Sequence, residues 1–251
     1  MIQCKNCHEQ VQNKFCSHCG QKTTVGRITL KGLMRDLPHA VFHVDRGFLY
    51  NILHLFRQPG TAIEQYLSGK RKLFFHPASY LVIALILNYI VVKTTDMHFY
   101  DEGELKGMDS FKATAIRDYD ALQWWFLEHT YIYILIAIPA SSVFLLGIFK
   151  LMKIGYNLAE TAAIVLFTVA QGVLIQTFIY LCLGWVNSGP FIRAVETCNA
   201  FILIFYASLV IYQLLSSVNQ KLVRSVFAFI AGLGLAVVWV GSAYLLYLLL
   251  A

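Results

Sequence analysis

Five stretches of this 251-residue chain run for at least twenty residues without a charged side chain. A helix of about 20 residues crosses the hydrocarbon core of a bilayer, so each stretch is long enough to span it. Only 14% of the residues are charged, against about 25% in an ordinary soluble domain, which excludes most soluble folds. We therefore predict an all-α polytopic membrane protein with five transmembrane helices, at about residues 77–93, 130–149, 161–186, 197–217 and 225–250.

The segments between these stretches alternate in charge. Fifteen Lys and Arg fall on one side of the predicted membrane with five acidic residues, and five fall on the other side with nine acidic residues. Because cytoplasmic loops are enriched in Lys and Arg, this asymmetry predicts a cytoplasmic N-terminus and an extracytoplasmic C-terminus. The first apolar run begins beyond residue 70, so we expect no signal peptide and a multi-pass protein of the cell membrane.

Four of the six cysteines form the strongest motif in the chain. They are Cys4, Cys7, Cys16 and Cys19. Two C-x2-C pairs separated by eight residues suit tetrahedral coordination of Zn2+, and four thiolates leave no open position for water or substrate. The predicted zinc site is therefore structural. A pair of disulfides or a redox couple is the rival interpretation, which a reducing cytoplasm disfavours.

The cysteines define a predicted cytoplasmic zinc ribbon over residues 1–24. A segment this short cannot bury a core, so metal binding would supply its folding free energy. His8 and His18 adjoin the predicted ligands, but the sulfur set is already complete, so we expect both to be surface residues. Gly20 follows the second pair, where a tight turn favours glycine.

Residues 28–72 carry signals for a series of basic amphipathic helices. Capping residues, prolines and glycines divide the segment at Thr29–Pro38, Asp45–Gly60 and Thr61–Gly69. On the second helix the apolar side chains fall on one face, and the polar ones, Asn51 among them, fall on the other. Such a helix lies in the headgroup plane or packs against the cytoplasmic ends of the spans, and the sequence leaves both interpretations open.

The basic residues of this segment indicate its partners. Lys70, Arg71 and Lys72 meet the membrane, where each basic residue near an anionic surface adds about 1 kcal/mol of attraction. We expect contact with the lipid bilayer and with anionic inner-leaflet lipids, and leave open a cytoplasmic protein partner and a homo-oligomer. Nucleic acid is a weaker alternative, because no stacking aromatics interleave a basic groove.

The N-terminal third also resembles a known family through a series of short motifs. They stand at residues 15–22, 27–31, 39–43, 45–50, 57–60, 66–72 and 76–77. They look like the bacterial membrane-protein family called domain of unknown function 3667, over about the first 80 residues. The resemblance implies a zinc-ribbon protein of the bacterial inner membrane without a known activity, and His8 departs from the glycine frequent there. The five-span layout is similar to Yip1-like membrane proteins in topology alone.

Polar residues within the predicted spans are few, and we expect them to serve packing. Two stripes of small or polar residues share a helical face and would mediate contacts between helices. They comprise Thr161, Thr168, Gly172 and Gln176 in the third span and Ala228, Gly232 and Ala236 in the fifth. The loop at residues 93–129 holds eight acidic residues, which we expect to form a solvated face.

No catalytic motif such as G-x-S-x-G or H-E-x-x-H occurs, so the sequence favours a non-enzymatic protein. The leading hypothesis is an interaction or membrane-organising protein whose ribbon and basic helices engage a partner or the inner leaflet. A small-solute transporter or channel subunit is the alternative, suggested by Pro139 and by the amide residues of the third span.

Overall fold

Five long apolar helices dominate the structure. The computed structural model describes residues 2–35, 47–95, 105–106, 108–186 and 188–250. The long helices are α5 (Pro77–Thr95), α8 (Thr130–Leu151), α9 (Leu158–Leu183), α10 (Gly189–Leu214) and α11 (Lys221–Leu250). Each contains a segment long and apolar enough to cross a membrane, which confirms the predicted fold class of a helical protein with five such segments.

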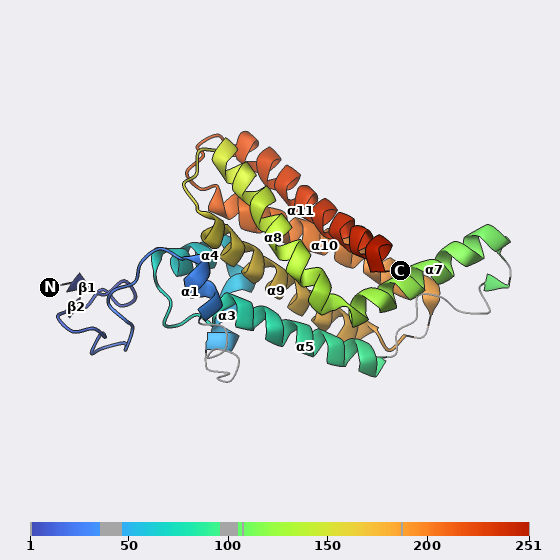
Figure 1. Ribbon diagram of the computed structural model, residues 1–251, viewed down its shortest axis with the longest axis horizontal. Helices are drawn as coiled ribbons and strands as arrows, with labels where there is room; N and C mark the ends of the chain where they lie inside the picture. The colour runs from blue at the N-terminus through green and yellow to red at the C-terminus, as the bar shows by residue number, and fades with distance from the viewer. Residues whose placement is uncertain (1, 36–46, 96–104, 107, 187, 251) are drawn as a thin grey trace.

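The long helices run back and forth along one axis. Figure 1 shows α5, α9 and α11 running away from the N-terminal segment, while α8 and α10 run back toward it. The connections at residues 152–157 and 215–220 therefore lie at the N-terminal end of the bundle, and α11 finishes at the opposite end. Among the described residues, the segments with the basic excess thus gather at the N-terminal end of the bundle.

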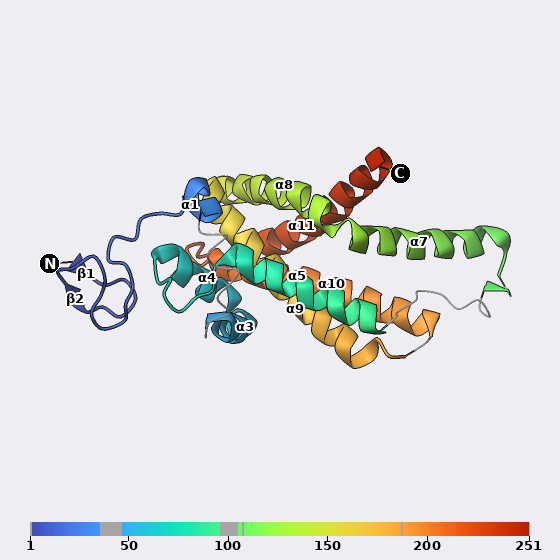
Figure 2. The ribbon, with the colours of Figure 1, turned by 60° about the horizontal axis from the view of Figure 1, so that its bottom comes forward.

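Shorter elements lie at both ends. At the N-terminal end, β1 (Ile2–Gln3) and β2 (Gln10–Val11) form an antiparallel pair. They are followed by α1 (Leu30–Arg35), α3 (Gly47–Arg57) and α4 (Pro59–Ser68). Figure 2 shows α3 and α4 beside the start of α5, with the β1–β2 segment projecting beyond them. The predicted boundaries at Pro38 and Asp45 lie outside the described residues.

One further helix, α7 (Ser110–Glu128), corrects the expectation of a plain loop at residues 93–129. Asp109 caps it, because its side chain accepts a hydrogen bond from the backbone N–H of Lys112 at 2.9 Å. The helix carries charged residues along its length, so a search for uncharged stretches passes over it. Four of the eight acidic residues expected on this loop, at 96, 101, 102 and 104, lie outside the described residues.

Three of the long helices begin earlier than the uncharged stretches suggest, and in each of them a charged residue near the start has a partner in the protein. Glu160 in α9 pairs with Arg27. Glu196 in α10 accepts a hydrogen bond from Tyr180, and the guanidinium of Arg224 in α11 lies 3.9 Å from the centre of the Tyr212 ring. A charge satisfied in this way is tolerated inside a helix that continues into the bilayer.

Helix α4 begins at Pro59, not at the capping box expected from Thr61. Proline fits the first turn of a helix because its missing N–H would have no intrahelical partner. The free backbone N–H of Gly60 instead donates to the side-chain Oε1 of Gln213 in α10, at 2.8 Å. A Cβ at Gly60 would lie 2.3 Å from that of Gln213, so only glycine allows this approach. Gly69 ends the helix as predicted, with a left-handed φ of 112°.

Asn51 corrects the expected division of α3 into an apolar and a polar face. Its side chain is fully buried. It accepts a hydrogen bond from the backbone N–H of Phe75 at 3.1 Å and donates one to the carbonyl oxygen of the same residue at 3.3 Å. Both backbone polar groups of Phe75 are thereby satisfied two residues before α5 begins. Asn51 therefore fixes where the chain turns into the first long helix.

Side chains from α9 and α10 reach the backbone of α3 in the same manner. Tyr206 donates to the carbonyl oxygen of Leu55 at 3.0 Å, and Gln171 lies 3.5 Å from that of Ile52. Gln171 also accepts a hydrogen bond from the hydroxyl of Tyr80. Gln171, one of the amides of the third span, thus contacts both α3 and α5 from α9.

Candidate metal centre

The four N-terminal cysteines come together at one point. Their sulfur atoms all lie within 4.8 Å of one another, and no other group of potential metal ligands is found among the described residues. Cys4 and Cys19 have sulfurs 3.6 Å apart, and those of Cys7 and Cys16 are 3.5 Å apart. A zinc ion with four Zn–S bonds of about 2.3 Å places its sulfurs about 3.8 Å apart. The cluster therefore has the size that a tetrahedral metal ion needs, and its sulfurs are too far apart to be disulfide-bonded.

Each C-x2-C pair folds into the same tight turn. In the first, the backbone N–H of His8 donates to the carbonyl oxygen of Cys4 at 2.9 Å, and in the second Gly20 donates to Cys16 at 2.8 Å. The residue that closes each turn has a left-handed backbone, with φ of 63° at His8 and 71° at Gly20. The first turn forms with histidine where the family resemblance led us to expect glycine, because histidine is among the residues that tolerate this conformation.

Backbone amides of these turns point at the sulfurs. The backbone N–H of Cys7 is the main cause that lowers the pKa of Cys4 to about 7, and that of Cys19 lowers the pKa of Cys16. For Cys7 the backbone N–H of Glu9 acts in the same direction, but burial and the neighbouring sulfurs outweigh it and raise the pKa to about 12. Four thiolates this close repel one another unless a cation lies between them.

The cysteines are also most of the hydrophobic core of this segment. Cys4, Val11 and Cys16 are its buried apolar residues, with the remaining two cysteines packed against them. One valine and four thiols bury far too little apolar surface to fold a segment of this length in water. The stability of the segment must therefore come from a bound metal or from contacts with the rest of the chain.

Gln21 makes the closest of those contacts. Its side chain is only 4% exposed. The amide Nε2 donates to the carbonyl oxygen of Gly69 at 2.9 Å, and Oε1 accepts from the backbone N–H groups of Arg71 and Lys72 at 3.0 and 3.1 Å. Gln21 lies two residues after the last cysteine, so the metal centre is tied directly to the turn between α4 and α5.

Arg27 and Asn157 tie the next part of the chain to the start of α9. The Nε of Arg27 donates to Glu160 at 2.9 Å, and its Nη2 contacts the second oxygen of the same carboxylate. This pairing raises the pKa of Arg27. Asn157 forms a capping box with Glu160 and donates to the carbonyl oxygen of Ile28 at 3.2 Å. The chain is thus fixed at three successive points, Gln21, Arg27 and Ile28.

The other residues singled out in the sequence have structural surroundings. In the fifth span, a Cβ at Gly232 would lie 3.0 Å from the backbone nitrogen of Ser208, so the stripe there lets α11 approach α10 as expected. Both stripes also border an apolar cavity of about 290 Å3 between α8, α9, α10 and α11. Thr168, Gly172 and Gln176 line it from α9. His8 and His18 are exposed, which agrees with their expected role as surface residues.

Comparison with known proteins finds one similarity. The family model described as "Protein of unknown function (DUF3667)" matches residues 45–88. The match covers α3, α4 and the first part of α5, and the cysteine segment, over which we also expected resemblance, lies outside it. No curated protein and no solved structure matches the chain. The matched range includes Asn51 and the backbone groups that Asn51, Tyr206 and Gln213 contact.

Replacing Gln21 by alanine should loosen the junction between the metal centre and the bundle. The variant leaves two backbone N–H groups and one carbonyl without their partner, and a net hydrogen bond contributes about 1 kcal/mol. We expect amide hydrogen exchange in peptides covering residues 69–73 to accelerate about fivefold or more. The matched control is Gln12→Ala, an exposed glutamine of the same segment. Equal exchange in the two variants would show that Gln21 does not hold the junction.

Proposed function

We propose that this chain is a non-enzymatic protein of a bacterial cytoplasmic membrane, in which a zinc-stabilised ribbon forms a platform with α1, α3 and α4 on the cytoplasmic leaflet. The observation that carries this proposal is the buried contact of Gln21 with the turn at residues 69–72. A segment on a flexible tether would need no such contact. Fixed as it is, the ribbon presents one defined surface beside the point where the chain turns into the bundle.

Zinc is the metal that suits the donor set. Four thiolates in two C-x2-C turns are typical of structural zinc sites, and they leave no position for a substrate. When bound, the ion neutralises the thiolates and fixes the two turns relative to each other. Gln21 then connects the two fixed turns to the turn before α5 through its side-chain hydrogen bonds.

The zinc assignment predicts one zinc per chain in the purified full-length protein, measured by mass spectrometry of the metal content. Cys16→Ser should lose most of the zinc, because three ligands hold a structural ion far less tightly than four. His18→Ala changes a neighbouring exposed residue and should keep the full content. Zinc near zero in the unaltered protein, or equal contents in the two variants, would contradict the assignment.

The cytoplasmic orientation of the platform rests on charge. The basic segments gather at the ribbon's end of the bundle, and the positive-inside rule places that end in the cytoplasm. The ion pair of Arg27 with Glu160 is neutral as a whole and leaves the basic excess of that side unchanged.

Reporter fusions test this orientation in cells. Alkaline phosphatase fused after the last residue should be active and green fluorescent protein there should be dark, because the enzyme needs an oxidising compartment for its disulfides. Fusions after Asn219, between α10 and α11, should give the opposite pattern. A fluorescent C-terminal fusion would place the ribbon outside the cytoplasm.

Contact of the platform with lipid is supported by the outer face of α3. Leu49, Leu53 and Phe56 are 64%, 55% and 67% exposed, although they fall on one side of the helix. The opposite side, with Leu55 and Asn51, is buried against the bundle. A helix that shows an apolar stripe beside a set of membrane spans is suited to lie at the headgroup boundary. Packing on the spans accounts for the buried face of α3, and interfacial contact is our proposal for its exposed face.

A tryptophan placed on α3 measures this contact. Phe56→Trp in vesicles should add fluorescence that lipids brominated on their acyl chains quench, because the side chain would lie among those chains. Phe15→Trp is the control, since Phe15 is a comparably exposed residue of the ribbon and lies outside α3. After subtraction of the signal from the native tryptophans, equal quenching at the two positions would place α3 away from the bilayer.

A further inference from the structure

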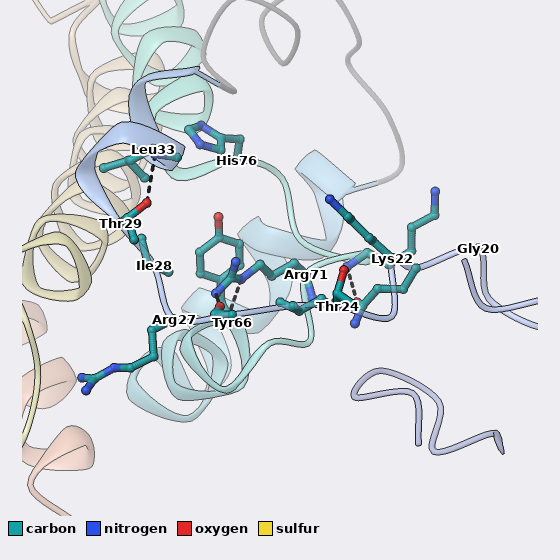
Figure 3. Close-up of a pocket in the computed structure, with 15 residues that line it drawn as sticks. Gly20, Lys22, Thr24, Arg27, Ile28, Thr29, Leu33, Tyr66, Arg71 and His76 are labelled. Atoms are coloured by element: carbon teal, nitrogen blue, oxygen red, sulfur yellow. Dashed lines mark hydrogen bonds between the residues drawn. The ribbon is translucent and has the colours of Figure 1, made fainter. Parts of the chain in front are cut away.

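A basic cavity of about 390 Å3 lies where the ribbon meets the bundle. Figure 3 shows it between the chain that leads from Gly20 to Leu33 and the segment that holds Tyr66, Arg71 and His76. Its volume falls within the range of small-molecule sites, about 300–1,000 Å3. Four of the described residues that line it are Lys or Arg, and none of the described lining residues is acidic.

Two of these four cations have no partner in the described part of the chain. Lys22 forms a β-bridge with Phe15, and the backbone N–H of Lys72 donates to Gln21, but neither ammonium group makes an ion pair or a hydrogen bond with any described residue. The methylene next to the Lys72 ammonium lies 3.7 Å from the Cβ position of Gly20, which places that side chain against the ribbon. Two positive charges without an acidic partner among the described residues favour an anion over water in a concave site.

The two arginines differ in whether the guanidinium group is available to a bound anion. In Figure 3 the guanidinium of Arg27 points away from Tyr66, toward its carboxylate partner Glu160. Arg71 stays at the cavity, where it donates to the carbonyl oxygen of Gly26 at 2.9 Å and lies 5.6 Å from the centre of the Tyr66 ring. Neutral acceptors and an aromatic ring orient this guanidinium without cancelling its charge.

We propose that this cavity binds a phosphate group, through Lys22, Lys72 and Arg71. An oriented guanidinium with two mobile ammonium groups matches the several oxygens and the charge of a phosphate better than a single carboxylate. The phosphate is that of an anionic phospholipid headgroup or of a soluble phosphate compound. The lipid source rests on the proposed function, because the platform would place the cavity at headgroup level. Leu30 and Leu73, each 49% exposed beside the cavity, are suited to contact the acyl chains.

The test uses the full-length protein in neutral detergent, with two probes. Inorganic phosphate is titrated calorimetrically at low salt, and 1-palmitoyl-2-oleoyl phosphatidylglycerol is compared with the matching phosphatidylcholine by native mass spectrometry. The double variant Lys22→Gln, Lys72→Gln should weaken binding of the preferred probe about tenfold or more, because each charged hydrogen bond it removes contributes measurably. The control, Lys14→Gln with Lys31→Gln, removes the same charge from exposed lysines outside the cavity.

The outcomes separate the two sources. Retention of phosphatidylglycerol over phosphatidylcholine that depends on the cavity lysines supports a lipid headgroup. Saturable phosphate binding that depends on them, without a lipid preference, supports a soluble phosphate compound. An equal loss in the cavity and control variants, or no saturable binding of either probe, overturns the proposal. Zinc content and thermal unfolding show whether both variants fold. Neither probe depends on the orientation of the protein or on lipid contact of α3, so failure of the proposed function is distinguishable from failure of the phosphate site.

Discussion

The structure depends on satisfying the backbone where the chain enters the bundle. A bilayer offers no water to an unpaired N–H or carbonyl group, so every helix end near it needs a partner from the protein. Asn51 provides both partners for Phe75, and Gln213 provides one for Gly60. The same requirement explains why polar side chains such as Gln213 and Tyr206 occur in the long apolar helices. They hold α3 and α4 in place.

The metal centre extends this arrangement outward. Its own core is little more than four cysteines, so a bound ion would give the segment a fixed shape, while Gln21 gives it a fixed place. The two contributions are separable, because one acts within the ribbon and the other acts between the ribbon and the bundle. Together they bring basic side chains of the junction to one cavity, where Lys22 and Lys72 have no acidic partner among the described residues.

Local patterns explain most of what could be predicted. Uncharged length identified the five long helices, and cysteine spacing identified the residues that cluster, because both depend on neighbours in the chain. The predicted start of α4 and the predicted polar face of α3 were wrong, because in both cases a residue distant in the sequence takes part in the hydrogen bond. Helix α4 begins at Pro59 because Gln213 replaces the expected cap, and Asn51 is buried because Phe75 needs it. Helix α7 was passed over because its charged residues interrupt the apolar run, although the cap at Asp109 was a local signal.

The sequence by itself determined the number of long helices, the separation of basic and acidic segments, and the four-cysteine cluster. These follow from helix length, charge and short-range spacing. Only the tertiary structure decided which polar groups pair across the chain, such as Gln21 with the turn before α5 and Arg27 with Glu160. It also brought Lys22 and Lys72 to one cavity from segments fifty residues apart. Such pairings depend on packing geometry, and no local pattern in the sequence encodes them.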